Sequence, residues 1–241
     1  MRVLSYRRLL LAFLLLAGLA GAWLFGLTGA APTPPGAAYT LPARPFEAPH
    51  DRSLRLAVLG TSLSSHAVWP DALAARLSDC APAGIVVSRA ARPGATSRDG
   101  LAALHGLTVG TTPPDLLLVE FSGNDAALRH ALTLPASRDR HQRIIAQARA
   151  AGAEVILMTM SPAWGLNAAE RPGLRRYQAL YRDLASETGV GLIDTVAAWQ
   201  GLSADDRTRL IPDGLHPTDA GQEQVLLPVA EAALRSLICP K

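Results

Sequence analysis

The chain has 241 residues, the length of one domain with an additional segment, and its 49% of hydrophobic residues can fill a sizeable core. Its two cysteines exclude a disulfide-stapled miniprotein, a cysteine-rich zinc module and an iron–sulfur protein. The net charge of +3 comes from three arginines within residues 1–30, because the remainder carries 20 basic and 20 acidic residues. This neutral body argues against a nucleic-acid partner.

The N-terminal segment predicts export. Arg7 and Arg8 precede an apolar run over residues 9–27, and no charged residue follows Arg8 until Arg44. A basic start before an apolar stretch is typical of a secretory signal peptide or of an uncleaved membrane anchor. The run is long for a signal peptide, whereas the small residues 28–30 offer a cleavage site, so both readings stay open. In either case we expect the body in the periplasm or on the extracytoplasmic face of the inner membrane.

A proline-rich stretch follows the apolar run. Residues 31–53 combine several prolines with small and polar residues, which predicts an extended, semi-rigid linker. We therefore divide the chain into a signal peptide or anchor at 1–30, a linker at 31–53 and one folded domain at 54–241.

The domain alternates short apolar strands with helices. Strands are expected at 54–59, 85–87, 115–121, 154–160 and 190–193. Helices are expected from Trp69 onward and at 137–151, 175–188 and 222–237. This alternation predicts an α/β fold whose central five-stranded parallel sheet has helices on both faces. Ligands of such sheets bind at the carboxyl ends of the strands, so polar residues just after a strand are the first candidates for a site.

Four short motifs occupy such positions or a late loop. They are Gly60-Thr61-Ser62-Leu63-Ser64, Arg92-Pro93-Gly94-Ala95-Thr96, Ser122-Gly123-Asn124-Asp125 and Asp213-Gly214-Leu215-His216-Pro217. Each is common by itself, because such serines and asparagines often cap helices or close turns. Their joint occurrence, each after the right element, indicates a catalytic site.

The motifs hold the groups that acyl transfer to a serine requires. A serine hydroxyl becomes nucleophilic when a base takes its proton, which predicts Ser62 as nucleophile and His216 as base. Asp213 can orient the imidazole and stabilise its charged form. The backbone N–H groups of Ser62 and Gly94 and the side-chain amide of Asn124 can hold the oxyanion.

These motifs resemble those of the SGNH hydrolases, also called the GDSL esterases and lipases. The resemblance covers residues 54–237, and the chain departs from the family name at Thr61, where that name has aspartate. It places the family's nucleophile, glycine, asparagine, acidic partner and histidine on Ser62, Gly94, Asn124, Asp213 and His216. It implies a flavodoxin-like three-layer α/β/α sandwich with an exposed active site and no metal.

Two other kinds of site fit the residues less well. An α/β-hydrolase needs a second glycine after its serine, in G-x-S-x-G, and the motif at Ser62 lacks it. A metal bound by Asp125, Asp213 and His216 would leave Ser62 and Gly94 without a role. We therefore expect neither a metal nor another cofactor.

Three further residues carry open alternatives. In a flavodoxin-like order the first and last helices pack on one face of the sheet, so Cys80 and Cys239 at their ends could form a disulfide after export. Two unpaired cysteines are the alternative. Trp164, in the loop after the fourth strand, is expected either at the rim of the site, stacked on a sugar or acyl group, or as a cover of the core.

The sequence thus predicts an exported serine esterase that hydrolyses acetyl or short-chain O-acyl esters through an acyl-enzyme. The expected substrates are esters on envelope or extracellular glycans, or small lipid esters. An O-acyltransferase with the same triad and a non-catalytic, membrane-tethered glycan-binding module are the alternatives. No residue identifies the acyl group, the acceptor or the oligomeric state.

Overall fold

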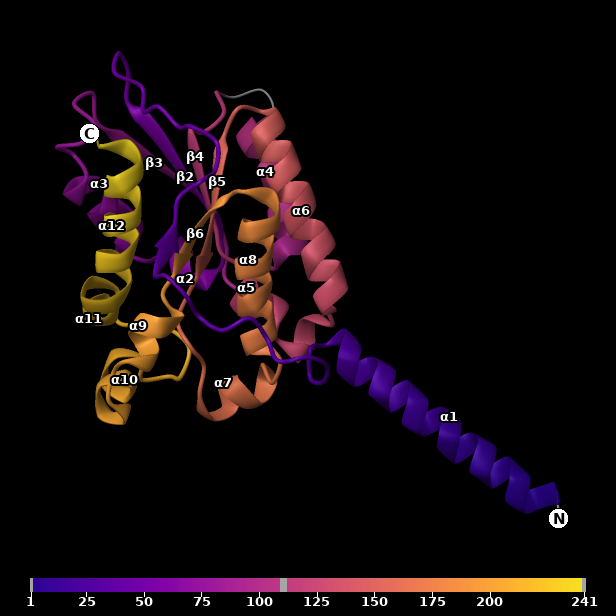
Figure 1. The fold of residues 1–241 in the computed structure, drawn as a ribbon. Coiled ribbons are helices and arrows are strands. Elements are labelled where there is room, and N and C mark those ends of the chain that lie inside the picture. The colour runs from indigo at the N-terminus through magenta and orange to yellow at the C-terminus, as the bar shows by residue number, and fades with distance from the viewer. Residues whose placement is uncertain (1, 109–111, 240–241) are drawn as a thin grey trace.

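A six-stranded sheet forms the centre of the computed structural model, which describes residues 2–108 and 112–239 (Figure 1). The strands are β1 (Tyr39–Thr40), β2 (Leu54–Gly60), β3 (Ile85–Ala91), β4 (Leu116–Val119), β5 (Glu154–Thr159) and β6 (Gly191–Asp194). Their order is β1-β6-β5-β4-β2-β3, in which β2 to β6 run parallel and β1 pairs antiparallel with β6. The five parallel strands are the predicted ones, and they have the order of flavodoxin-like sheets.

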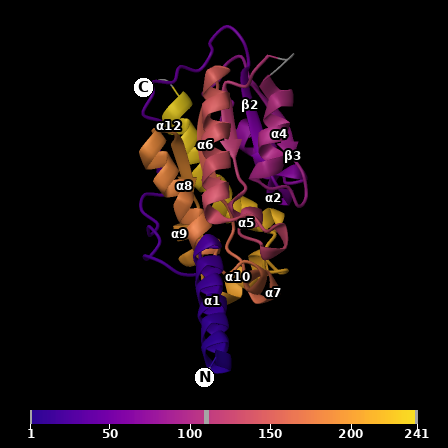
Figure 2. The ribbon, with the colours of Figure 1, turned by 90° about the vertical axis from the view of Figure 1, so that its right-hand side faces the viewer.

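Helices cover both faces of this sheet (Figures 1 and 2). One face packs against α3 (Trp69–Arg76) and α12 (Leu227–Ile238). The other face packs against α4 (Ser97–Thr108), α6 (Leu134–Ala150) and α8 (Leu174–Thr188). Side chains of β2 alternate between the two cores, with Leu56 and Val58 in the first and Ala57 and Leu59 in the second. A strand buried on both faces reads as a continuous apolar run, which is why the sequence shows it clearly.

Shorter elements connect these layers. They are α2 (Ser62–Ser65), α5 (Ser122–Asp125), η1 (Leu128–His130), α7 (Gly165–Glu170), α9 (Val196–Gln200), α10 (Ala204–Leu210), α11 (Asp219–Gly221) and η2 (Gln222–Leu226). The helix expected at 222–237 is therefore divided, with η2 as a π-helical turn before α12. The third predicted strand is shorter than expected, because β4 ends at Val119 and the chain then turns toward the site.

The sheet has one strand more than the five expected. Residues Tyr39 and Thr40, inside the proline-rich stretch, pair with Ile193 and Leu192 of β6. They cover backbone groups that would otherwise lie unpaired at the edge of the sheet. The backbone N–H of Ala43 also donates to the carbonyl of Gly189, at 3.0 Å. Part of the linker thus lies on the domain instead of spanning free solvent.

The N-terminal helix α1 (Arg2–Leu24) projects from the body (Figure 1). Among the described residues it is the one helix long and apolar enough to cross a membrane, over Tyr6–Leu24, and none of that span is buried. A signal sequence at an N-terminus has the same properties.

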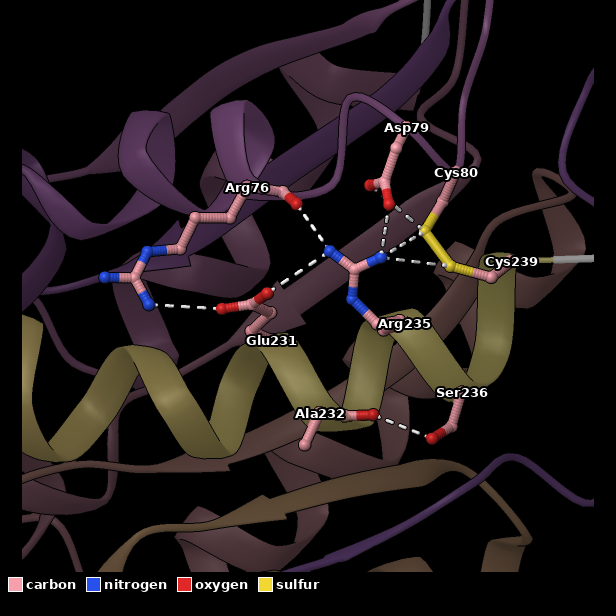
Figure 3. Close-up of a disulfide and its surroundings, with 8 residues drawn as sticks. All are labelled: Arg76, Asp79, Cys80, Glu231, Ala232, Arg235, Ser236 and Cys239. Atoms are coloured by element: carbon pink, nitrogen blue, oxygen red, sulfur yellow. Dashed lines mark hydrogen bonds and ion pairs between the residues drawn. A yellow bond between two sulfur atoms is a disulfide. The ribbon is translucent and has the colours of Figure 1, made fainter.

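A disulfide joins Cys80, just after α3, to Cys239 at the end of α12 (Figure 3). The two Cα atoms are 4.5 Å apart and 159 positions apart in the sequence. The guanidinium of Arg235 lies beside both sulfur atoms and forms an ion pair with Asp79 at 2.7 Å. The closing helix α12 is thereby attached to the end of α3.

Candidate active site

Three of the predicted site residues follow neighbouring strands at one edge of the sheet. Ser62 begins α2 directly after β2, Gly94 lies between β3 and α4, and Asn124 lies in α5 after β4. The strand order reverses between β2 and β4, which is where ligands bind in open α/β sheets. Asp213 and His216 lie between α10 and α11 and reach the same edge, because His216 contacts Ser62.

A chain of short hydrogen bonds connects three of these side chains. Ser62 Oγ lies 2.9 Å from His216 Nε2, and His216 Nδ1 lies 2.6 Å from Asp213 Oδ2. The other carboxylate oxygen of Asp213 accepts the backbone N–H groups of Leu215, at 2.8 Å, and His216, at 2.7 Å. This local turn holds the carboxylate against the imidazole on the side of the ring away from the serine. Serine, base and orienting acid thus occupy the relative positions that nucleophilic catalysis requires.

The carboxyl group of Asp213 is suited to carry a negative charge. Partial burial pushes its pKa up, but the hydrogen bonds from His216 and Leu215 outweigh that effect and hold the pKa below its usual value. An ionised Asp213 keeps the proton of the imidazole on Nδ1, which leaves Nε2 free to accept the hydroxyl proton of Ser62.

The loop of Asp213 is braced by the start of α7. Trp164 donates its backbone N–H to the carbonyl of Gly214 at 3.0 Å, and Asn167 Nδ2 donates to the carbonyl of Asp213 at 2.9 Å. Gly214 has φ +79°, and a Cβ there would lie 2.7 Å from the carbonyl oxygen of Trp164. The side chain of Trp164 is partly buried against the small core around Trp199. The side chain thus contributes to covering this core, one of the two positions expected for it, and its role at the rim of the site stays a prediction.

A hydrogen bond connects Asn124 to the loop that contains Gly94. Asn124 is 5% exposed, and its Nδ2 donates to the carbonyl of Ala95 at 2.9 Å, which leaves the second amide hydrogen for another acceptor. Gly94 has φ +74°, and among the described residues no atom lies within 4 Å of a Cβ built there. The space beside Gly94 is thus open to a ligand.

A buried acid, Glu120, lies behind the serine and was missed in the sequence. Its Oε1 accepts the backbone N–H of Thr61 at 2.5 Å and the hydroxyl of Ser64 at 2.7 Å, and its Oε2 accepts the hydroxyl of Thr61 at 3.0 Å. Burial raises the pKa of Glu120 to about 7, although these hydrogen bonds oppose the rise. A methyl group at Gly60 would overlap the Glu120 carboxylate. The carboxyl group therefore fixes the residues on both sides of Ser62.

A second buried network supports the turn that carries Asn124. Asp125 accepts the backbone N–H of Ser97 at 2.8 Å and the hydroxyl of Ser137 at 2.6 Å. His141 Nε2 lies 2.9 Å from the hydroxyl of Tyr181, which accepts the backbone N–H of Phe121 at 2.7 Å. Complete burial lowers the pKa of His141, so we assign it a neutral, structural role.

Arg171 connects the turn that carries Asn124 to Asn167, which bonds to the loop of Asp213. Its side chain is buried, its Nε donates to the carbonyl of Gly123 at 2.9 Å, and its Nη1 donates to Asn167 Oδ1 at 2.9 Å. In the sequence, the cluster of Arg171, Arg175 and Arg176 is interpreted as a solvated helix face, with attraction of an anionic substrate as the alternative. A solvated position is wrong for Arg171, because the residue precedes α8 and its guanidinium is a buried link between loops.

The part of the chain that the structure describes contains no group of three or more His, Cys, Asp or Glu side chains that could hold a metal ion. The carboxylate of Asp125 accepts hydrogen bonds from Ser97 and Ser137 in the structural network.

The chain was compared with known proteins. The model of the GDSL-like lipase/acylhydrolase family matches residues 56–224. The search of curated proteins gave no match. A lipase/acylhydrolase from Enterococcus faecalis has a similar structure, with 22% identity, a TM-score of 0.67 and coverage of 78% of this chain and 98% of that one.

Two further structures are similar. TesA has 26% identity and a TM-score of 0.61, with coverage of 76% of this chain and 99% of that one. A catalytic mutant of Axe2, an acetylxylan esterase from Geobacillus stearothermophilus, has 19% identity and a TM-score of 0.60, with coverage of 78% and 94%. The family match spans most of the chain and agrees with the fold and with the four motifs. The chain therefore belongs to the GDSL-like lipase/acylhydrolase family and is a serine hydrolase of the esterase type.

Proposed function

We propose that this chain is an exported, membrane-anchored serine esterase that hydrolyses acetyl or short-chain O-acyl esters with Ser62, His216 and Asp213. The observation that carries the proposal is the continuous hydrogen-bond chain from Ser62 Oγ through the imidazole to the Asp213 carboxylate, with distances of 2.9 and 2.6 Å.

The mechanism follows from the positions of these atoms. His216 Nε2 takes the proton of Ser62 as the oxygen attacks the ester carbonyl, and the carbonyl π electrons move onto its oxygen. The backbone N–H groups of Ser62 and Gly94 and the free amide hydrogen of Asn124 stabilise this oxyanion. The imidazolium then protonates the leaving alcohol, and the acyl group stays on Ser62. Water, deprotonated by His216, attacks the acyl-enzyme and releases the carboxylic acid and the free serine.

The exposure of the site favours a small acyl group on a large carrier. The side chains of His216 and Asp213 are 45% and 50% exposed, so the triad lies at the surface of the domain. A bulky alcohol moiety can approach an exposed triad, as a glycan would in the reaction that the name of the acetylxylan esterase neighbour implies. We therefore propose O-acyl groups on envelope or extracellular glycans, or on small lipids, as the substrate class.

The chain just after α1 contacts the domain. The helix ends in a Schellman motif, in which Gly26 has φ +68° and donates to the carbonyl of Trp23 at 3.0 Å, while Leu27 donates to that of Ala22 at 2.8 Å. Gly26 is buried, and Arg176 Nη2 donates to the carbonyl of Gly29 at 2.9 Å. Residues 27–30 are otherwise exposed, so these contacts do not shield the candidate cleavage site. The proposal of an anchor rests on the length of the apolar span, which is long for a signal peptide.

The proposal is tested by hydrolysis of p-nitrophenyl acetate with the full chain in detergent. Ser62→Ala and His216→Ala are each expected to lower kcat by at least about 10⁴-fold, as the loss of a triad member does in serine hydrolases. Ser65→Ala, in the same short helix, is the matched control and is expected to keep wild-type activity. Wild-type activity in Ser62→Ala would disprove the assignment of the nucleophile. Faster release with an added glycan alcohol, yielding an acylated glycan, would assign acyl transfer in place of hydrolysis.

A further inference from the structure

The segment that leaves α1 follows helix α8 along the domain. Arg176, in the first turn of α8, contacts Gly26 and donates to the carbonyl of Gly29. Further along α8, Arg182 Nη1 donates to the carbonyl of Thr33 at 3.0 Å, and Thr33 Oγ1 donates to Asp183 at 2.7 Å. The segment then forms β1 and reaches Gly189, just after the end of α8. The segment therefore runs alongside α8 in the same direction as the helix, from its first turn to its end.

The direction of α8 shows at which edge of the sheet α1 is attached. Because β5 precedes α8 and β6 follows it in a parallel sheet, α8 begins at the carboxyl edge and ends at the amino edge. Ser62 and Asn124 also lie at the carboxyl edge. The contact between Gly26 and Arg176 thus attaches the apolar helix at the catalytic edge. Figures 1 and 2 agree, since α1 leaves the body at the end where α7 and α10 lie.

The attachment is short. The apolar span ends at Leu24, and the contact with Arg176 begins at Gly26, two positions later. Two residues of extended chain span at most about 7 Å. A bilayer that holds α1 therefore lies within about 10 Å of the first turn of α8, without a long spacer that would let the domain turn away.

Exposed apolar side chains gather at the same edge. Outside α1 and Leu27, the large hydrophobic residues exposed in the described part of the chain are Leu41, Val68, Val86, Leu128 and Leu166. Three of the five lie in connections beyond the carboxyl ends of strands: Val68 after α2, Leu128 after α5 and Leu166 in α7. Leu166 is 91% exposed and is the most exposed of the five.

A basic side chain also lies at this edge. Arg175, in the first turn of α8, is exposed, whereas Arg129, next to Leu128, is exposed but forms an ion pair with Glu170 of α7. Apolar side chains that enter the interface, next to a basic residue such as Arg175 that attracts anionic lipid headgroups, are a common means of attachment to a bilayer.

We propose that α1 and its docked segment hold the catalytic edge against the bilayer, with Leu166 inserted in the interface, so that the site takes acyl esters carried by amphipathic molecules in the outer leaflet. This inference rests on the proposed anchored esterase and selects the lipid-carried esters from its substrate class. A soluble extracellular glycan would have to enter from the side, between domain and membrane.

The first test measures the position of residue 166 without using activity. The full chain carrying Leu166→Cys is labelled with an environment-sensitive fluorophore and reconstituted in vesicles of phosphatidylglycerol and phosphatidylcholine that contain doxyl-labelled lipid. Val86→Cys is the matched control, because Val86 is 56% exposed and lies near the start of β3, at the opposite edge. We expect at least twofold stronger quenching at position 166 than at position 86. Equal quenching at both positions, or loss of α1 from the mature chain, would overturn the proposal.

The second test uses two substrates. Leu166→Asp is expected to lower hydrolysis of a fluorogenic acyl ester embedded in the vesicles about tenfold, because insertion of a leucine contributes roughly that factor in local binding. Its hydrolysis of soluble p-nitrophenyl acetate, and both activities of Val86→Asp, are expected to stay within twofold of wild type. An equal loss on both substrates would overturn the membrane role of Leu166. A wild-type chain without any esterase activity would instead refute the proposed function, while the quenching result would still decide the orientation.

Discussion

Replacing Glu120 with glutamine is expected to change how the stability of the protein depends on pH. The carboxyl group is completely buried, and the groups that donate hydrogen bonds to it, from Thr61 and Ser64, are neutral. Burial without a cationic partner raises its pKa from 4.5 to about 7. Glutamine has nearly the same shape and does not titrate. Its carbonyl oxygen can accept the Thr61 N–H and the Ser64 hydroxyl, and its NH2 group can donate to the Thr61 hydroxyl.

The sign and size of the effect follow from proton linkage. Between pH 4.5 and 7 the folded protein keeps a proton on Glu120 that the unfolded chain releases, so the free energy of unfolding falls as the pH rises through this range. The stabilisation is complete below pH 4.5 and lost above the folded-state pKa of about 7. At 1.36 kcal/mol for each unit, the total loss is about 3 kcal/mol.

The assay is urea denaturation of the wild type and of Glu120→Gln between pH 4.5 and 8. Other groups titrate in both proteins, so the measured quantity is the difference in free energy of unfolding between the two at each pH. This difference is expected to move by about 3 kcal/mol in favour of the glutamine variant as the pH rises from 4.5 to 8. A difference that stays constant over this range would refute the assignment of a raised pKa to Glu120.

Three other changes test the site and the fold. Asp213→Asn is expected to lower kcat about 10⁴-fold in ester hydrolysis with little change in stability, because the amide group favours the wrong tautomer of His216. Gly214→Ala is expected to cost about 1–2 kcal/mol in urea denaturation at its positive φ, and to lower kcat by displacing the loop. Joint replacement of Cys80 and Cys239 by serine is expected to lower the free energy of unfolding by about 4–5 kcal/mol, measured against the oxidised wild type.

Much of the fold could be predicted because its strands are buried on both faces. The apolar runs of β2, β4 and β5 are bounded by polar or turn residues, so their position is visible without tertiary information. Strand β1 could not be found in this way, since its two residues join the sheet only through backbone pairing with β6. Helix α4 was missed because it contains two glycines, and Gly100 is required there by close contact with the Phe121 ring.

In the candidate site, too, some residues could be predicted from the sequence and others could not. Ser62, Asn124 and His216 could be predicted because each residue type has a chemical role and lies in a short motif. Glu120 could not, since it acts on Thr61 from 59 positions away in the sequence. A charged residue at the end of an otherwise apolar strand was the available signal.

The contact of Glu120 with Thr61 gives a physical reason for the departure from the family name. Thr61 Oγ1 accepts the backbone N–H of Leu63 at 3.2 Å and so caps α2, which an aspartate at this position could also do. The same hydroxyl donates to Glu120, and an ionised aspartate has no proton to donate.

The segment from Trp164 to Arg171 joins the proposed membrane contact to the chemistry. Leu166 is directed to solvent, whereas its neighbour Asn167 bonds to the carbonyl of Asp213 and accepts from Arg171. A displacement of α7 at the bilayer would therefore reach the acidic member of the triad through one side chain. It follows that a substitution in α7 that lowers activity on a lipid-carried ester has two possible causes, poorer access or a displaced Asp213. Only the second also lowers hydrolysis of a soluble ester, so the soluble ester separates the two effects at every position of this segment.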